Sequence, residues 1–183
     1  MKTVQREEIL DFATYAEGRT GVRAKVIEAK AVRRIHVGVL TFLFENRDTI
    51  RYQVHEMMLA ERIVKDADIR RELETYNELL GGPGELGATL LIEIESAAER
   101  DVKLTRWLDL PGTLYARLED GRRIRPAFDA RQISDGRLSS VHYVKFSTGG
   151  AVPVAIGCDH ADIATEALLS PVQQAALAAD LKD

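Results

Sequence analysis

Two glutamates lie on a segment whose apolar spacing is that of a helix. The segment is IRYQVHEMMLAERI, residues 50–63. With about 100° between successive residues, Glu61 falls near the middle of the apolar stripe that contains Ile50 and Met58, and Glu56 lies beside a second, partly apolar strip. A buried carboxylate is costly unless a cation, a metal or hydrogen-bond donors compensate it. Both glutamates are therefore candidate site residues. The structural alternatives are that Glu61 pairs with a buried arginine or that its side of the helix is exposed to water.

A second group of candidates lies late in the chain, on two expected strands. His142 shares the apolar face of SVHYVKFS with Val144 and Phe146. Asp159 and His160 directly follow the strand VPVAIGC, where a chain leaving a sheet can present side chains to a pocket. Imidazole titrates near neutrality, so these residue types suit metal ligation or general acid–base catalysis. A hydrogen-bonded core histidine and a turn capped by the aspartate are the structural alternatives.

Together these side chains form a plausible carboxylate and imidazole set for one metal ion. The set is Glu56, Glu61, His142, Asp159 and His160. Such donors favour iron, manganese or zinc over a soft metal held by thiolates. We expect Glu56 or Glu61 to point toward His142 and the Asp159–His160 strand end, in one polar pocket. The sequence motifs of zinc proteases, paired-cysteine sites, serine hydrolases and phosphate-binding loops do not occur.

Two more carboxylates and one thiol are weaker candidates. Glu93 and Glu95 take the same face of an expected strand, where they could share a cation or simply form a solvent-facing row. Cys158 could be a thiol ligand, but a small buried apolar role is more common for a free cysteine. As the single cysteine, it excludes an intrachain disulfide and a cysteine-only zinc site.

The elements that must position these residues alternate irregularly along the chain. Periodicity predicts helices at 5–13, 20–34, 50–63, 67–80, 97–108 and 170–181. Alternating, β-branched segments predict a strand pair turning near Gly38 and strands within 88–96, 113–128, 140–147 and 152–158. Hairpin-type connections favour an α+β fold with a largely antiparallel sheet. We expect a single domain over 1–183, with N-terminal helices in 1–34 and a C-terminal helix in 170–182 packed on the sheet.

Composition excludes several classes of function. The chain has 183 residues and a formal charge of −4, with 25 basic and 29 acidic residues well mixed along it. No basic run suggests a nucleic-acid groove, and no segment reaches the ~18 continuous apolar residues of a membrane span. The N-terminus MKTVQREEILDF has no apolar signal-peptide core. We therefore expect a cytoplasmic protein that binds neither nucleic acid nor membranes.

Several stretches resemble a bacterial domain-of-unknown-function family, number three-five-zero-one. They are LTFLFENRDTIRYQVHEMMLAERI, ELETYNELL, TLLIEIESAAER, SVHYVKF and GCDH, which occur in order over most of the chain. The resemblance carries over to Tyr52, Gln53, Glu56, Met57, Glu61, Arg62, Glu93, Glu95, Arg100, His142, Asp159 and His160. His36, His55 and Cys158 do not match family positions. The resemblance implies a redox or oxidative-stress setting by association, because such proteins are often encoded near rubrerythrin-like and iron–sulphur proteins.

Two functions follow as hypotheses. The first is a metal-binding redox or oxidative-stress accessory protein that uses the carboxylate and histidine set. The alternative is a non-enzymatic interaction protein that docks on a rubrerythrin-like or iron–sulphur redox partner, in which the buried polar groups serve structure only. The alternative predicts glutamate–arginine pairing and a sizeable exposed apolar patch. A third possibility, a metal-free small-molecule enzyme, would need a pocket around His142 and a carboxylate with a perturbed pKa.

Overall fold

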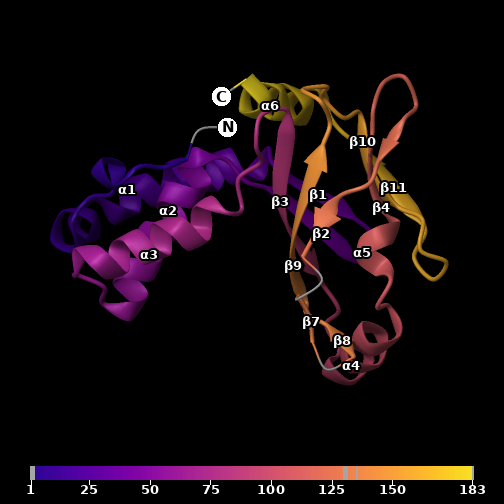
Figure 1. Cartoon of the computed structure of the whole chain (residues 1–183), viewed down its shortest axis with the longest axis horizontal. Coiled ribbons are helices and arrows are strands. Elements are labelled where there is room, and N and C mark those ends of the chain that lie inside the picture. Colours follow the sequence, from indigo (N-terminus) through magenta and orange to yellow (C-terminus); the bar gives the residue numbers. More distant parts are fainter. Residues whose placement is uncertain (1–2, 130–131, 135, 183) are drawn as a thin grey trace.

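The computed structural model describes residues 3–129, 132–134 and 136–182, and it places one group of helices beside the strands and further helices around them (Figure 1). The helical part, which we call the helical lobe, consists of the 3-10 turn Arg6–Glu8 and the helices α1 (Phe12–Ala31), α2 (Arg47–Glu61) and α3 (Asp66–Asn77). α1 packs against α2, which in turn packs against α3. The short helix expected at 5–13 is only a 3-10 turn, and the long helix begins at Phe12, because the side chain of Asp11 caps it there.

The first sheet has the strand order β1-β2-β3-β9-β6. Its strands are β1 (Arg34–Val37), β2 (Leu40–Phe44), β3 (Glu85–Ile92), β9 (Val141–Ser147) and β6 (Ala127–Phe128). β1 and β2 form the expected hairpin at Gly38, whose φ is +62°. The Asn46 side chain then accepts a hydrogen bond from the Thr49 backbone N–H and caps α2.

The second sheet has the order β11-β10-β4-β5 and faces the first across the main core. Its strands are β4 (Leu114–Arg117), β5 (Arg123–Ile124), β10 (Ala155–Cys158) and β11 (Thr165–Leu168). Only Arg125 and Pro126 separate β5 in this sheet from β6 in the first, so the chain crosses between the sheets there. The strand β11 has no counterpart among the sequence predictions, because TEAL is short and weakly apolar.

The remaining elements close the ends of the sheets. They are α4 (Ala97–Arg106), α5 (Leu110–Thr113), the hairpin of β7 (Ile133–Ser134) and β8 (Arg137–Leu138), and α6 (Pro171–Lys182). α6 lies at the top in Figure 1 and contributes Leu177 to the main core. It is also held by Asp180, which pairs with Arg33 at 2.7 Å. All strand pairs of the described residues are antiparallel, which confirms the α+β class.

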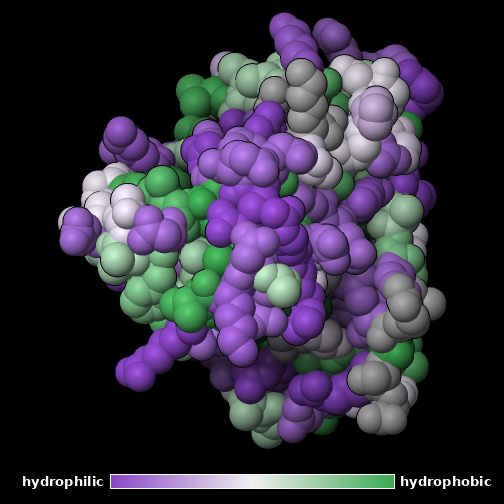
Figure 2. Space-filling view, turned by 60° about the vertical axis from the view of Figure 1, so that its left-hand side comes forward, coloured by the Kyte–Doolittle hydropathy of each residue, from purple (hydrophilic) through white to green (hydrophobic). Residues whose placement is uncertain are grey.

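Buried apolar residues form two clusters. The larger one lies between the two sheets and includes Phe42, Phe146 and Trp107. The smaller one lies in the helical lobe around Val54 and Met58. Figure 2 brings the helical lobe forward and shows hydrophilic side chains over the middle of this face, with hydrophobic groups gathered beside them. No helix in the described part of the chain is both long and apolar enough to cross a lipid bilayer.

Candidate functional site

Glu56 lies in the helical lobe, where an arginine and a tyrosine occupy its carboxylate. Arg19 on α1 donates two hydrogen bonds, from Nε to Oε1 at 2.8 Å and from Nη2 to Oε2 at 2.6 Å. The Tyr15 hydroxyl donates to Oε1 at 2.8 Å. The Arg19 hydrogen bonds outweigh burial and lower the pKa of Glu56 to about 2, with Tyr15 adding to the effect. This partly buried carboxylate therefore already has a cationic partner.

Glu61 is exposed, so the expectation that it lies in a buried stripe is wrong. α2 ends at Glu61, and Arg62 takes a left-handed conformation with φ of 55° while its N–H bonds to the Met58 carbonyl. The stripe that Ile50 begins stays buried as far as Met58 and then stops. Helical spacing places Glu61 on the core side only if the helix continues past it, and here the chain turns away.

His142 is fully buried in the main core. It lies on β9 opposite Leu90 of β3, on the same face as Val144 and Phe146, as the strand alternation predicts. Neither of its ring nitrogens makes a hydrogen bond of good geometry to any described residue. Burial lowers the pKa of His142, and a weaker interaction with the Ser139 backbone opposes that shift. The ring is therefore a neutral imidazole among apolar side chains.

Asp159 leaves β10 and pairs with two arginines. Arg125 Nη2 lies 2.6 Å from Oδ2, and its Nη1 donates to Oδ1 at 3.1 Å. Arg123 Nη1 lies 3.5 Å from Oδ2, and its guanidinium stacks 4.3 Å from the centroid of the Tyr115 ring. The hydrogen bonds from Arg125 lower the pKa of Asp159. Asp159 thus ties β10 to the strands around β5.

His160 is buried, and both of its ring nitrogens have partners. Nδ1 accepts the Asp162 backbone N–H at 3.2 Å, so the proton of the neutral ring lies on Nε2, which is 3.2 Å from Asp109 Oδ1. The ring also meets Trp107 edge-on, with centroids 5.8 Å apart. These contacts hold a turn and leave His160 no free nitrogen for a metal or a substrate.

The predicted residues therefore occupy separate places. Glu56 is in the helical lobe, His142 is in the main core, and Asp159 and His160 are at the end of β10 in different contacts. Within residues 3–129, 132–134 and 136–182, no three histidine, cysteine, aspartate or glutamate side chains gather closely enough to hold a metal ion.

This arrangement predicts the outcome of a metal analysis. Protein purified without a chelator should contain well below one equivalent of iron, manganese or zinc, because a metal would have to displace arginine from Glu56 or Asp159. Elemental analysis and a visible spectrum measure this directly. Near-stoichiometric metal that disappears in the His142→Ala and His160→Ala variants would instead support the metal-binding hypothesis.

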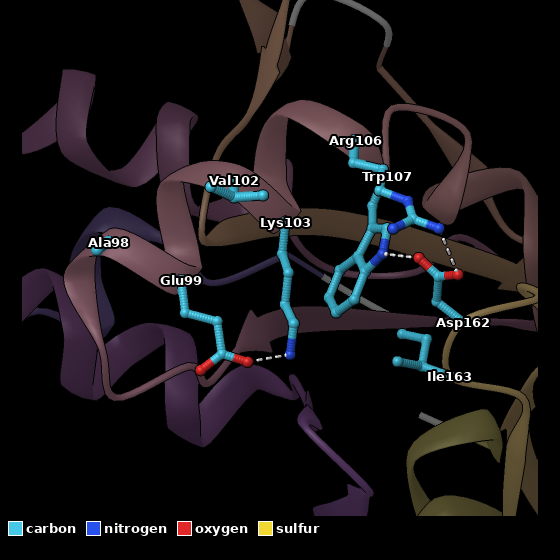
Figure 3. Close-up of a pocket in the computed structure, with 8 residues that line it drawn as sticks. All are labelled: Ala98, Glu99, Val102, Lys103, Arg106, Trp107, Asp162 and Ile163. Atoms are coloured by element: carbon cyan, nitrogen blue, oxygen red, sulfur yellow. Dashed lines mark hydrogen bonds and ion pairs between the residues drawn. The ribbon is translucent and has the colours of Figure 1, made fainter.

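A shallow pocket beside α4 is lined by paired charges (Figure 3). Its volume is about 640 Å³. Asp162 accepts the indole N–H of Trp107 at 2.8 Å and a hydrogen bond from Arg106 at 3.0 Å. Lys103 pairs with Glu99 and lies 5.4 Å from the centroid of the Trp107 ring. The charges cancel within the pocket wall, and the two hydrogen bonds of Asp162 fasten the end of α4 to the loop after β10.

A second pocket lies where the helical lobe meets the outer face of the first sheet, and we call it the corner groove. Its volume is about 380 Å³. It is lined by Glu78, Leu79, Ala127, Phe128, Asp129, Gln132, Tyr143, Val144 and Lys145. The chain leaving α3 forms one wall, and β6 and β9 form the others. Tyr143 is 43% exposed there, and Val141, two residues earlier on the same face, is 38% exposed.

A buried carboxylate, Glu45, lies near the groove. It is 7% exposed, and it accepts hydrogen bonds from the hydroxyls of Thr49 at 2.5 Å and Thr89 at 2.7 Å. Among the described residues, no lysine or arginine nitrogen lies within 4.0 Å of it. Thr89 pairs across the strands with Tyr143. Burial raises the pKa of Tyr143, and electrostatic interactions with Tyr76 and with the carboxylate of Glu45 raise it further.

A glycine allows the groove to form. The carbonyl oxygen of Leu79 would lie 2.0 Å from a Cβ built on Gly87, so only glycine lets the exit of α3 cross β3 at this point. The Glu45 N–H donates to the Gly87 carbonyl at 2.9 Å and ties the start of α2 to the same strand. The helical lobe is thus seated on the sheet by direct backbone contact.

The sequence prediction missed Glu45 and Tyr143. Glu45 directly follows LTFLF, a strand in which all five residues are buried, and a carboxylate at the end of such a strand is a usable signal. Tyr143 carried a weaker signal, since alternation placed it on the face opposite His142. Their proximity follows from the pairing of β3 with β9, which local patterns do not reveal.

Comparison with known proteins gives a family and a fold. No curated protein matches the chain. The structure is similar to the crystal structure of a novel protein of unknown function from Burkholderia pseudomallei K96243, with a TM-score of 0.90 and 33% identity, over 98% of this chain and 100% of that one. The family model described as "Protein of unknown function (DUF3501)" matches residues 3–181. The chain therefore belongs to the DUF3501 family, as the sequence resemblance predicted.

Proposed function

We propose that the protein is a cytoplasmic, non-enzymatic interaction protein that docks a partner protein in the corner groove. The observation that carries this proposal is the exposure of Tyr143 and Val141 beside the groove, on the outer face of β9. Aromatic residues in pockets supply much of the energy of protein interfaces. An exposed apolar area beside a groove is a common mark of such a surface.

The charges of the groove specify the partner's surface. Glu78 is exposed in the lining of the groove, Glu45 lies buried near it, and Lys145 is the basic residue among the described residues of the lining. The negative charges of Glu78 and Glu45 favour a basic partner surface. This proposal takes its partner class, a rubrerythrin-like or iron–sulphur redox protein, from the family resemblance.

Three of the other candidate site residues already have protein partners for their polar atoms, which supports a non-enzymatic role. Glu56 and Asp159 are neutralised by arginine, and both nitrogens of His160 are used within its turn. A general base needs a free lone pair within reach of the proton it abstracts. The hydrogen bonds and ion pairs of these three residues stabilise the fold instead.

Binding measurements test the proposal. The purified protein is titrated calorimetrically with a rubrerythrin-like protein and an iron–sulphur protein of the same organism. We expect one of them to bind, and the Val141→Asp/Tyr143→Asp variant to bind at least about tenfold more weakly, which is about 1.4 kcal/mol. The control is Val102→Asp, which changes an exposed valine on α4 outside the groove. Binding by neither protein, or equal loss in the control, would contradict the proposal.

A further inference from the structure

We infer that the corner groove receives one cationic side chain, a lysine or an arginine, from the docked partner. This inference rests on the proposed function and adds the chemistry of the contact. It draws on the aromatic wall of the groove, its carboxylates and its size.

The aromatic wall is the ring of Tyr143. Its partial exposure leaves ring surface open to the groove. A cation over such a ring gains from about 0.5 kcal/mol at exposed sites to about 2 kcal/mol where water is excluded. The chain already uses this contact elsewhere, since Arg123 lies over Tyr115 and Lys30 lies 5.4 Å from the centroid of the Tyr52 ring.

The carboxylates provide the opposite charge. Glu78 is exposed at the rim and is free to move toward an incoming cation. Two threonine hydroxyls hold Glu45, and one of them belongs to Thr89, which pairs directly with Tyr143 across the strands, so the negative charge of Glu45 lies close to the tyrosine. In the low-dielectric surroundings of a buried carboxylate such a potential is only weakly screened.

Lys145 lines the groove and also has a carboxylate neighbour, because the pairing of Gly87 with Lys145 places Glu85 diagonally opposite it on the same face of the sheet. Hydrogen bonds from Ser147 and from the Gly82 N–H lower the pKa of Glu85, and the positive charge of Lys145 lowers it further. Glu85 pairs with Ser147 at the far end of β9, whereas Tyr143 lies nearer its start. Glu85 therefore offsets part of the positive charge that Lys145 brings to the groove.

The size of the groove suits one side chain. A volume of about 380 Å³ is near the lower end of the range of roughly 300–1,000 Å³ seen for small-molecule sites. Leu79 and Phe128 line it with apolar surface that can cover the methylene stem of a lysine or an arginine.

A pair of matched probes tests the inference by NMR. The ¹⁵N-labelled protein is titrated with N-acetyl-arginine methylamide and, separately, with the citrulline analogue, a neutral isostere. We expect saturable shifts of the Glu78, Tyr143 and Lys145 amides with the arginine probe, at millimolar affinity, and at least threefold weaker binding of the citrulline probe. The lysine and norleucine amides form a second charged and neutral pair.

Two variants and a control locate the binding. Glu78→Gln and Tyr143→Leu should each weaken arginine binding at least threefold, whereas Glu119→Gln, on the β4–β5 turn, should leave it unchanged. Equal binding of arginine and citrulline probes, or arginine shifts that lie outside the groove, would overturn the inference. Calorimetric partner binding that persists after that result would leave the proposed function standing, so the two failures are distinguishable.

Discussion

The Gly87→Ala variant should be destabilised by about 3 kcal/mol or more relative to the natural protein. The added Cβ would lie 2.0 Å from the Leu79 carbonyl oxygen and 3.0 Å from the Gly81 nitrogen. Both neighbours are backbone atoms, so no side-chain rotation relieves the clash, and the α3 exit must lift off β3. Urea denaturation followed by circular dichroism measures the loss.

Glycines in α1 provide the matched control. Nothing lies within 4 Å of a Cβ built on Gly18 or Gly21. Alanine loses less conformational freedom than glycine when a helix forms, so Gly18→Ala and Gly21→Ala should each stabilise the protein by roughly 0.5–1 kcal/mol. A Gly87→Ala variant that also gains stability, or whose free energy of unfolding falls by less than about 1 kcal/mol, would contradict this prediction. It would show that the segment after α3 can shift at little cost.

The same contact links the fold to the proposed interaction. Leu79 contributes both the carbonyl that presses on Gly87 and one wall of the corner groove. Moving this segment would change the distance between Glu78 and Tyr143, which the inferred cation must bridge. A Gly87→Ala protein that still folds should therefore bind the arginine probe more weakly than the natural protein does.

Features set by neighbouring residues were predictable from the sequence. The turn at Gly38 is confirmed because it depends on a few consecutive residues. The buried face of β9 was predictable as well, since alternation alone decides it. The α+β class then follows from the density of hairpins.

Features set by distant residues were not predictable. Glu56 meets Arg19 across 37 positions, and Thr89 meets Glu45 across 44. A helical wheel shows that Glu56 is near protein atoms but does not show which cation it meets. Glu61 fails for a different reason, because the wheel assumes that α2 continues and the left-handed Arg62 ends it. Asp159 likewise meets Arg125 across 34 positions, a pairing that local sequence patterns do not reveal.

Acid should weaken the fold well above the pH at which carboxylates protonate, because two buried histidines stay neutral. Burial lowers the pKa of His55 to about 4, and the pKa of His142 is also lowered by burial. In the unfolded chain both titrate near 6.5. The unfolded state therefore binds more protons below pH 6.5, so this stability is present above 6.5 and is lost as the pH falls. For His55 alone, the loss between pH 7 and 5 is about 2 kcal/mol.

Replacing His142 separates its contribution to the pH dependence of stability from that of His55. Both nitrogens of His142 lack a hydrogen-bond partner among the described residues, and each buried, unsatisfied polar group costs about 1–3 kcal/mol. We therefore expect His142→Leu to raise the free energy of unfolding by about 1–2 kcal/mol at pH 7, and by more at pH 5. Between pH 7 and 5 the variant should lose only the part of its free energy of unfolding that depends on His55.

Denaturant titrations at pH 7, 6 and 5 measure both effects. The control is His36→Gln on the exposed side of β1, whose free energy of unfolding should change with pH as that of the natural protein does. The ion pair of Glu56 does not interfere, because its stabilisation is lost only as the pH falls from about 4.5 toward 2. A His142→Leu protein that is less stable at every pH would mean that the imidazole makes a polar contact that a leucine cannot replace. The buried face of β9 around His142 would then be a second candidate binding site, besides the corner groove.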